Sequence, residues 1–175
     1  MASYIYLVKF FFILDNKGSR VVAKYYDDSE FDTTVKQKAF EKRVFDKTAK
    51  VNGEISILDS FTIVYRTYSN VTIYMVADNE QNEVALLNVL NTYTDTLHTI
   101  LDSNINKRNL LEGVNFTLLA LDEILDDGIV LESDSTIISD RVGIKIDGGD
   151  DLDSLDQSLG QVMASAREQL VNFLK

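Results

Sequence analysis

Hydrophobic residues near the start of the chain form two runs of the kind that build β-strands. The first run covers residues 4–14 and is rich in β-branched and aromatic side chains, and the second covers residues 19–26. Between them, the segment Asp15-Asn16-Lys17-Gly18 supplies residues that favour a chain reversal. This pattern predicts an N-terminal β-hairpin.

Three more short apolar runs follow in the middle of the chain. They cover residues 54–58, 61–68 and 71–77 and are separated by the pairs Asp59-Ser60 and Ser69-Asn70. Connections this short join strands that run in opposite directions. The pattern therefore predicts an antiparallel meander.

Elsewhere the apolar residues recur at steps of three and four, which is the spacing of one face of an α-helix. Helices are predicted over residues 33–50, 80–100, 111–125 and 135–142. Asp32 or Thr33 is expected to form the N-cap of the first helix. Gly128 is expected to end the third, because glycine readily adopts the left-handed conformation found after many helices.

The first predicted helix carries apolar residues on more than one side. Phe40 and Val44 lie close together on one arc. A second arc holds Val35, Ala39, Phe45 and Ala49. Because a sheet covers only one side of a helix, this pattern predicts that the first helix is contacted on two sides.

The order of the elements predicts an α+β fold, with a five-stranded antiparallel sheet and helices on both of its faces. Glycines and aspartates at residues 147–151 are predicted to form a loop, which marks the best boundary in the chain. Beyond it, apolar residues from 155 to 173 keep helical spacing and predict an amphipathic C-terminal helix. We expect one domain over residues 1–146, followed by an acidic linker and helix over residues 147–175.

Charge and cysteine content narrow the choice of partners. The formal net charge of −11 opposes binding to nucleic acids and to anionic membrane surfaces. The chain has no cysteine, which excludes disulfides and thiolate metal sites and is typical of a protein of the cytosol. The apolar run at residues 4–14 is shorter than the roughly 20 residues of a membrane-spanning helix. We therefore expect protein partners and only indirect contact with membranes.

The sequence is poor in the residues on which catalytic and metal sites depend. His98 is the only histidine, so a hydrolytic triad or a two-histidine metal site would have to be built around one imidazole. No glycine-rich phosphate-binding loop is present. The late aspartates do not fit an EF-hand, because Leu155, Asp156 and Val162 stand where a ligand, a glycine and a glutamate are required. We expect no enzyme activity, no cofactor and no metal.

One basic feature contrasts with the acidic background. Lys36, Arg43, Lys47 and Lys50 are spaced by seven, four and three residues, which places them along one face of the first helix. This basic stripe, together with Phe45 on the neighbouring arc, is the candidate partner-binding site. The stripe can dock against acidic groups of a partner or against lipid headgroups. Alternatively, its long side chains cover apolar surface and keep their charges in water.

Several segments resemble the zeta subunits of coatomer, the complex of the COPI vesicle coat, and they occur in the same order along the chain. They are AKYYDD (23–28), KQKAFEKRVFDKT (36–48), FTIVYRTYSNVTIYMV (61–76), ALLNVLNTYTDTL (85–97) and LLEGVNFTLLALDEILDDGIVLESD (110–134). The order of elements is also that of longin domains and of the sigma subunits of clathrin adaptors. The acidic stretch at 147–156 favours zeta, because sigma chains stop near the preceding helix.

The resemblance implies a longin-like domain that serves as a non-catalytic subunit of the COPI coat. Such a subunit pairs with the gamma subunit, joins the beta and delta subunits, and reaches membranes through an Arf GTPase bound to the large subunits. It is expected in the cytoplasm and on Golgi membranes and COPI vesicles, in Golgi-to-endoplasmic-reticulum and intra-Golgi transport. A sigma-type adaptor subunit that reads dileucine signals and a longin domain of a SNARE or tethering factor are the alternatives. No cargo site is transferred from the sigma chains.

Overall fold

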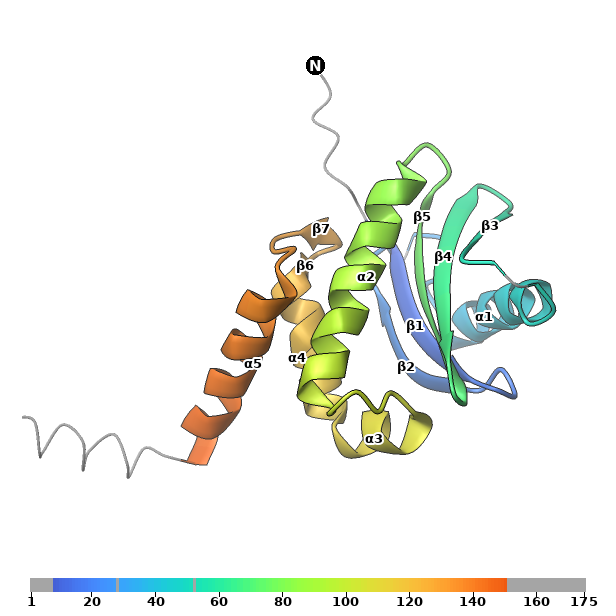
Figure 1. Ribbon diagram of the computed structural model, residues 1–175. Coiled ribbons are helices and arrows are strands. Elements are labelled where there is room, and N and C mark those ends of the chain that lie inside the picture. Colours follow the sequence, from blue (N-terminus) through green and yellow to red (C-terminus); the bar gives the residue numbers. More distant parts are fainter. Residues whose placement is uncertain (1–7, 28, 52, 151–175) are drawn as a thin grey trace, which may run out of the picture.

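A five-stranded antiparallel sheet forms the centre of the computed structural model, which describes residues 8–27, 29–51 and 53–150 (Figure 1). The strands are β1 (Phe10–Asp15), β2 (Arg20–Tyr25), β3 (Ile55–Leu58), β4 (Phe61–Tyr68) and β5 (Val71–Asp78). They lie side by side in the order β2-β1-β5-β4-β3. The predicted α+β fold and its antiparallel sheet are confirmed. Residues 4–7 of the first predicted strand lie outside the described residues.

The central strand β1 is buried on both faces, because successive side chains of a strand point to opposite sides of the sheet. Phe10 and Phe12 enter one hydrophobic cluster, and Phe11 and Ile13 enter the other. Each of these side chains is at most 1% exposed. The neighbouring strand β5 alternates in the same way. The sheet therefore requires an apolar cover on each face.

Helices supply both covers (Figure 1). They are α1 (Thr34–Thr48), α2 (Glu83–Ile100), α3 (Lys107–Glu112), α4 (Val114–Ile124) and α5 (Ser135–Asp150). On the face of Phe10, α1 contributes Phe40 and Val44 to the hydrophobic cluster. On the opposite face, α2 contributes Leu90 and α4 contributes Leu121, while α5 packs against both of these helices. Helices on both faces were predicted, and this is confirmed.

Side-chain hydrogen bonds fix the ends of the helices. Of the two N-cap candidates for α1, Thr33 takes the role: its side chain accepts a hydrogen bond from the backbone N–H of Lys36. Asn82 caps α2 in the same way. At the other end of α1, the hydroxyl oxygens of Thr48 and Tyr74 lie 3.0 Å apart. This contact ties the last turn of α1 to β5.

The third predicted helix is interrupted. The chain forms α3 and α4 instead of one helix over residues 111–125, and Gly113 stands between them with φ −102° and ψ 33°. Glycine costs a helix about 1 kcal/mol relative to alanine, so a break at this position is inexpensive. The buried residues of α4 are Thr117, Ala120, Leu121 and Ile124. Leu118, next to Thr117 on the same helix, is only partly buried.

Gly128 does not end this helix, so that prediction is wrong. After α4 the chain forms a small hairpin from β6 (Leu125–Asp126) and β7 (Ile129–Val130). Asp127 and Gly128 have φ of 47° and 79°, which suits the tight turn of a two-residue hairpin. A Cβ atom on Gly128 would lie 2.3 Å from the carbonyl oxygen of Val8, so glycine also permits this close approach to the residues before β1.

The loop predicted at residues 147–151 is wrong for residues 147–150, because α5 continues to Asp150. Two glycines in this stretch weaken a helix but keep every backbone N–H, unlike proline, which is absent from the chain. The predicted C-terminal helix lies outside the described residues. The boundary between residues 1–146 and 147–175 stays a prediction.

The burial of α4 can be tested with a matched pair of leucines. Leu121 is 0% exposed, whereas Leu111 on α3 is 48% exposed. Leu121→Ala should lower the free energy of unfolding by roughly 2–5 kcal/mol, and Leu111→Ala by no more than about 0.5 kcal/mol. Urea unfolding curves give both values. Equal losses would contradict the placement of α4 against the sheet.

Candidate partner-binding site

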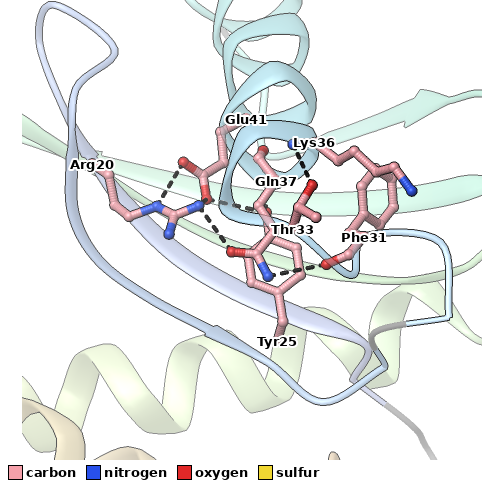
Figure 2. Close-up of polar contacts among 7 residues, drawn as sticks. All are labelled: Arg20, Tyr25, Phe31, Thr33, Lys36, Gln37 and Glu41. Atoms are coloured by element: carbon pink, nitrogen blue, oxygen red, sulfur yellow. Dashed lines mark hydrogen bonds and ion pairs between the residues drawn. The ribbon is translucent and has the colours of Figure 1, made fainter.

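The basic stripe lies on or just after α1, so the contacts that hold this helix also position the site. Figure 2 shows those contacts between α1 and the edge strand β2. Glu41 is only 2% exposed, and its carboxylate lies 2.6 Å from the guanidinium of Arg20. The hydroxyl of Tyr25 donates a second hydrogen bond to the same carboxylate at 3.0 Å. The buried charge of Glu41 is therefore satisfied by two residues of β2.

The surroundings of Tyr25 keep its phenol protonated. Burial, followed by the negative charge of Glu41, raises the pKa of Tyr25 far above its ordinary value. The first turn of α1 is held as well: Arg20 donates to the side-chain oxygen of Gln37 at 3.3 Å, and the Gln37 amide donates to the carbonyl oxygen of Phe31 at 3.1 Å (Figure 2). α1 is thus fixed at its start and its middle, and its outer face is open to solvent.

The stripe exists as a row of exposed cations beside the sheet. Lys36, at its N-terminal end, forms an ion pair of 2.7 Å with Asp32. Lys50, at the other end, is exposed just beyond the last turn. Exposed ion pairs of this kind contribute about 0–1 kcal/mol, so a stronger partner can replace Asp32 at little cost.

The middle of the stripe contacts the segment around β3. Arg43 forms an ion pair with Asp59, which lies in the turn between β3 and β4. The Lys47 ammonium donates a hydrogen bond to the carbonyl oxygen of Ile57 on β3. These contacts place the stripe alongside the outer edge of the sheet, a neighbourhood that the spacing of the lysines and arginine alone does not reveal.

Phe45 has a structural contact that the sequence did not indicate. It is half-buried and packs on the turn between β1 and β2, where a Cβ on Gly18 would lie 2.8 Å from its ring. The remaining residues of the second apolar arc are exposed: Val35, Ala39 and Ala49. Phe45 therefore supports the β1–β2 turn. A role in partner binding for Phe45 and for the stripe stays a prediction.

Sequence reasoning missed an exposed apolar strand next to the stripe. β3 is an edge strand, and its Ile55 and Ile57 side chains are 39% and 55% exposed. Ile55 pairs with Val64, whose side chain belongs to the cluster on the α2 side of the sheet. Apolar side chains on an open sheet edge are a liability unless a partner covers them. The alternation of residues 54–58 predicts a strand but carries no information on whether that strand lies at an edge.

We call these neighbouring residues the α1–β3 surface: Arg43, Lys47, Lys50, Ile55 and Ile57. Its apolar part is the exposed face of β3, and its cationic part is the end of α1. Lys47 joins the two parts through its hydrogen bond to β3. Ile55 and Ile57 face the α2 side of the sheet, whereas the cations lie on the α1 side, so the surface runs around the β3 edge and a partner that covers it must contact both sides of that edge.

Other kinds of site have little support in the part of the chain that the structure describes. Within it, no group of three or more His, Cys, Asp or Glu side chains is arranged to hold a metal ion. No helix among the described residues is long and apolar enough to cross a membrane. The ring of His98 packs edge-to-face against Tyr68 at 5.4 Å, a contact between α2 and β4.

Known proteins are similar to this chain in sequence and in fold. Residues 7–147 match the family described as "Clathrin adaptor complex small chain". Over 179 aligned residues, which cover 100% of both chains, the sequence is 57% identical to "Probable coatomer subunit zeta-A" of Dictyostelium discoideum. The chain belongs to the coatomer zeta subunits of this family.

Other coatomer zeta subunits are similar over most of their length. Human coatomer subunit zeta-1 is 41% identical over 95% of this chain and 92% of its own. Coatomer subunit zeta of Saccharomyces cerevisiae is 38% identical over 79% of this chain and 78% of its own. A chain in a homology model of the full-length AP-3 complex matches with a TM-score of 0.65 and 18% identity, covering 85% of this chain and 98% of that one. That likeness shows the fold alone.

Membership in the coatomer zeta subunits confirms the resemblance found in the sequence. The α1–β3 surface of this zeta-type chain lies within the residues that match the small-chain family. The support that remains for the sigma-type alternative is the fold, which zeta subunits and adaptor small chains share.

The anchoring of α1 is testable through its buried carboxylate. Glu41→Gln should lower the free energy of unfolding by about 1–3 kcal/mol, because the Arg20 guanidinium loses its charged acceptor. Chemical denaturation measures this value.

Glu54→Gln is the matched control. Glu54 pairs with Arg66 at 3.1 Å, but its side chain is 53% exposed, so the loss should stay below about 1 kcal/mol. If Glu41→Gln proved as mild as this control, the buried pair would not be what holds α1 to β2.

Proposed function

We propose that this chain is the zeta-type subunit of a COPI vesicle coat, that it acts without catalysis, and that it is held in the coat by stable pairing with a gamma subunit. The observation that carries this proposal is the 57% identity to a coatomer subunit zeta over the whole of both chains. The alignment covers every described element, including α1 and β3.

The α1–β3 surface supports pairing with a protein rather than with a membrane. Ile55 and Ile57 offer an apolar strip that is partly exposed in the isolated chain. The cations on the α1 side of the β3 edge favour a partner that carries carboxylates there as well as apolar contact residues. The net charge of −11 opposes direct adsorption of the whole chain to an anionic bilayer.

In this function the gamma subunit connects the chain to the rest of the coat. The beta and delta subunits complete the complex, and an Arf GTPase bound to the large subunits brings it to the membrane. The chain would then be cytoplasmic and peripheral on Golgi membranes and COPI vesicles. A clathrin-adaptor role is less well supported, because the AP-3 likeness is one of fold at 18% identity.

Co-expression tests the choice of partner. The full chain should co-purify in a stable one-to-one complex with the trunk of a coatomer gamma subunit. It should not co-purify with the trunk of the large adaptor subunit that binds sigma subunits. A chain that stays monomeric beside the gamma trunk, or that prefers the sigma partner, would refute the proposal.

The same complex tests the surface. Ile57→Asp should weaken gamma binding by about tenfold or more, since a charge in a desolvated apolar contact typically costs at least 1–3 kcal/mol. Leu131→Asp is the control, because Leu131 is 61% exposed on another part of the chain. It should leave the dissociation constant within about twofold, and both variants should keep the wild-type melting temperature. Equal weakening by the two variants would mean that gamma does not use the α1–β3 surface.

A further inference from the structure

A hollow of about 520 Å³ lies between the β1–β2 turn and the outer side of α1. Its charged lining residues are Lys17, Arg20, Lys38, Lys42, Glu41 and Asp46. The volume falls in the range of small-molecule sites. This hollow is distinct from the α1–β3 surface, because successive helix residues are about 100° apart and Lys42 therefore points to a different flank of α1 from Arg43.

Positive side chains outnumber negative side chains in this hollow. Arg20 and Glu41 neutralise each other at 2.6 Å. Lys17, Lys38 and Lys42 remain, and in the described part of the chain none of their ammonium groups forms an ion pair. Asp46 is the one other carboxylate of the lining. Three lysines against one aspartate leave the hollow positive in a chain whose net charge is −11.

We propose that this hollow binds a compact polyanion that carries two or more phosphate groups. Each lysine ammonium is a point charge with rotatable donors, which suits the many oxygen atoms of a phosphate. Because the three lysines outweigh Asp46, a ligand with several negative charges gains more attraction from the hollow than a singly charged anion does. The site lies beyond the proposed coat function, and its ligand chemistry is shared by free polyphosphates and phosphorylated lipid headgroups.

The shape of the hollow favours a phosphate ligand over an acidic peptide. A bound peptide needs an extended groove with apolar positions for alternate side chains. Here the lining contains a single large apolar residue, Phe45, and the charged groups surround one concavity. Gly18 and Ser19 of the β1–β2 turn complete the lining. These features fit a small ligand whose charges point outward in several directions.

Calorimetric titration of the full chain with sodium tripolyphosphate at constant ionic strength tests the site. Wild-type protein should bind saturably. Lys38→Gln with Lys42→Gln should weaken binding about tenfold or more, because two charged donors are lost. The control, Lys36→Gln with Arg43→Gln, makes the same change of charge on the other flank of α1 and should leave the affinity within about twofold. Absence of saturable binding, or equal weakening in both double variants, would overturn the proposal.

Two further arms identify the kind of ligand. Vesicles with 5% phosphatidylinositol bisphosphate are compared with phosphatidylserine vesicles of equal total charge. Selective binding to the former that is lost with Lys38→Gln and Lys42→Gln supports a headgroup, whereas tripolyphosphate binding without vesicle binding supports a soluble ligand. A polyglutamate peptide that binds as tightly as tripolyphosphate would overturn the preference for phosphate. None of these measurements requires the gamma subunit, so they stand apart from the test of the coat function.

Discussion

The burial of β1 on both faces is the constraint from which the rest of the structure follows. Phe10 and Phe12 on one side and Phe11 and Ile13 on the other are at most 1% exposed. A strand this apolar must lie at the centre of a sheet that is covered twice, since exposure of either face would leave large aromatic side chains in water. α1 supplies one cover, and α2 and α4 supply the other. The two ends of the sheet, β2 and β3, are left as edges.

The two edge strands differ in how α1 contacts them, and this difference determines which side chains stay exposed at each edge. At β2, Arg20 and Tyr25 satisfy the buried Glu41 of α1, so helix and edge are bound together. At β3, α1 reaches the edge through the exposed side chains of Arg43 and Lys47, and Ile57 stays 55% exposed. A surface of this kind suits a subunit that completes its burial in a larger assembly. Membership in the coatomer zeta subunits agrees with that view of the molecule.

The strands and most of the helices were predictable because their signals are local. The short apolar runs at residues 61–68 and 71–77 and the capping side chain of Thr33 depend only on neighbouring residues. The errors have equally physical causes. Gly113 breaks a helix that the leucine spacing made continuous, and Gly128 serves an Asp-Gly hairpin turn instead of a helix end.

The site was harder to predict than the fold, because its properties depend on tertiary neighbours. Spacing identified Arg43 and Lys47 as a stripe, but only the fold shows that they contact the β3 region. The sequence marks Phe45 only as an apolar residue of α1, and it does not reveal that the ring packs on the β1–β2 turn. The sequence does not single out Lys38 and Lys42, since nothing local distinguishes a lysine with an ion-pair partner from one without.

The central claim is that the chain binds its coat partner through the α1–β3 surface. Hydrogen–deuterium exchange, followed by mass spectrometry on the chain alone and in complex with the gamma trunk, tests it most directly. The account predicts that the complex slows exchange in peptides spanning the end of α1 and β3, over residues 43–58, more than in peptides spanning β6, β7 and the start of α5. Slower exchange confined to the β6–α5 region, with residues 43–58 unchanged, would contradict it.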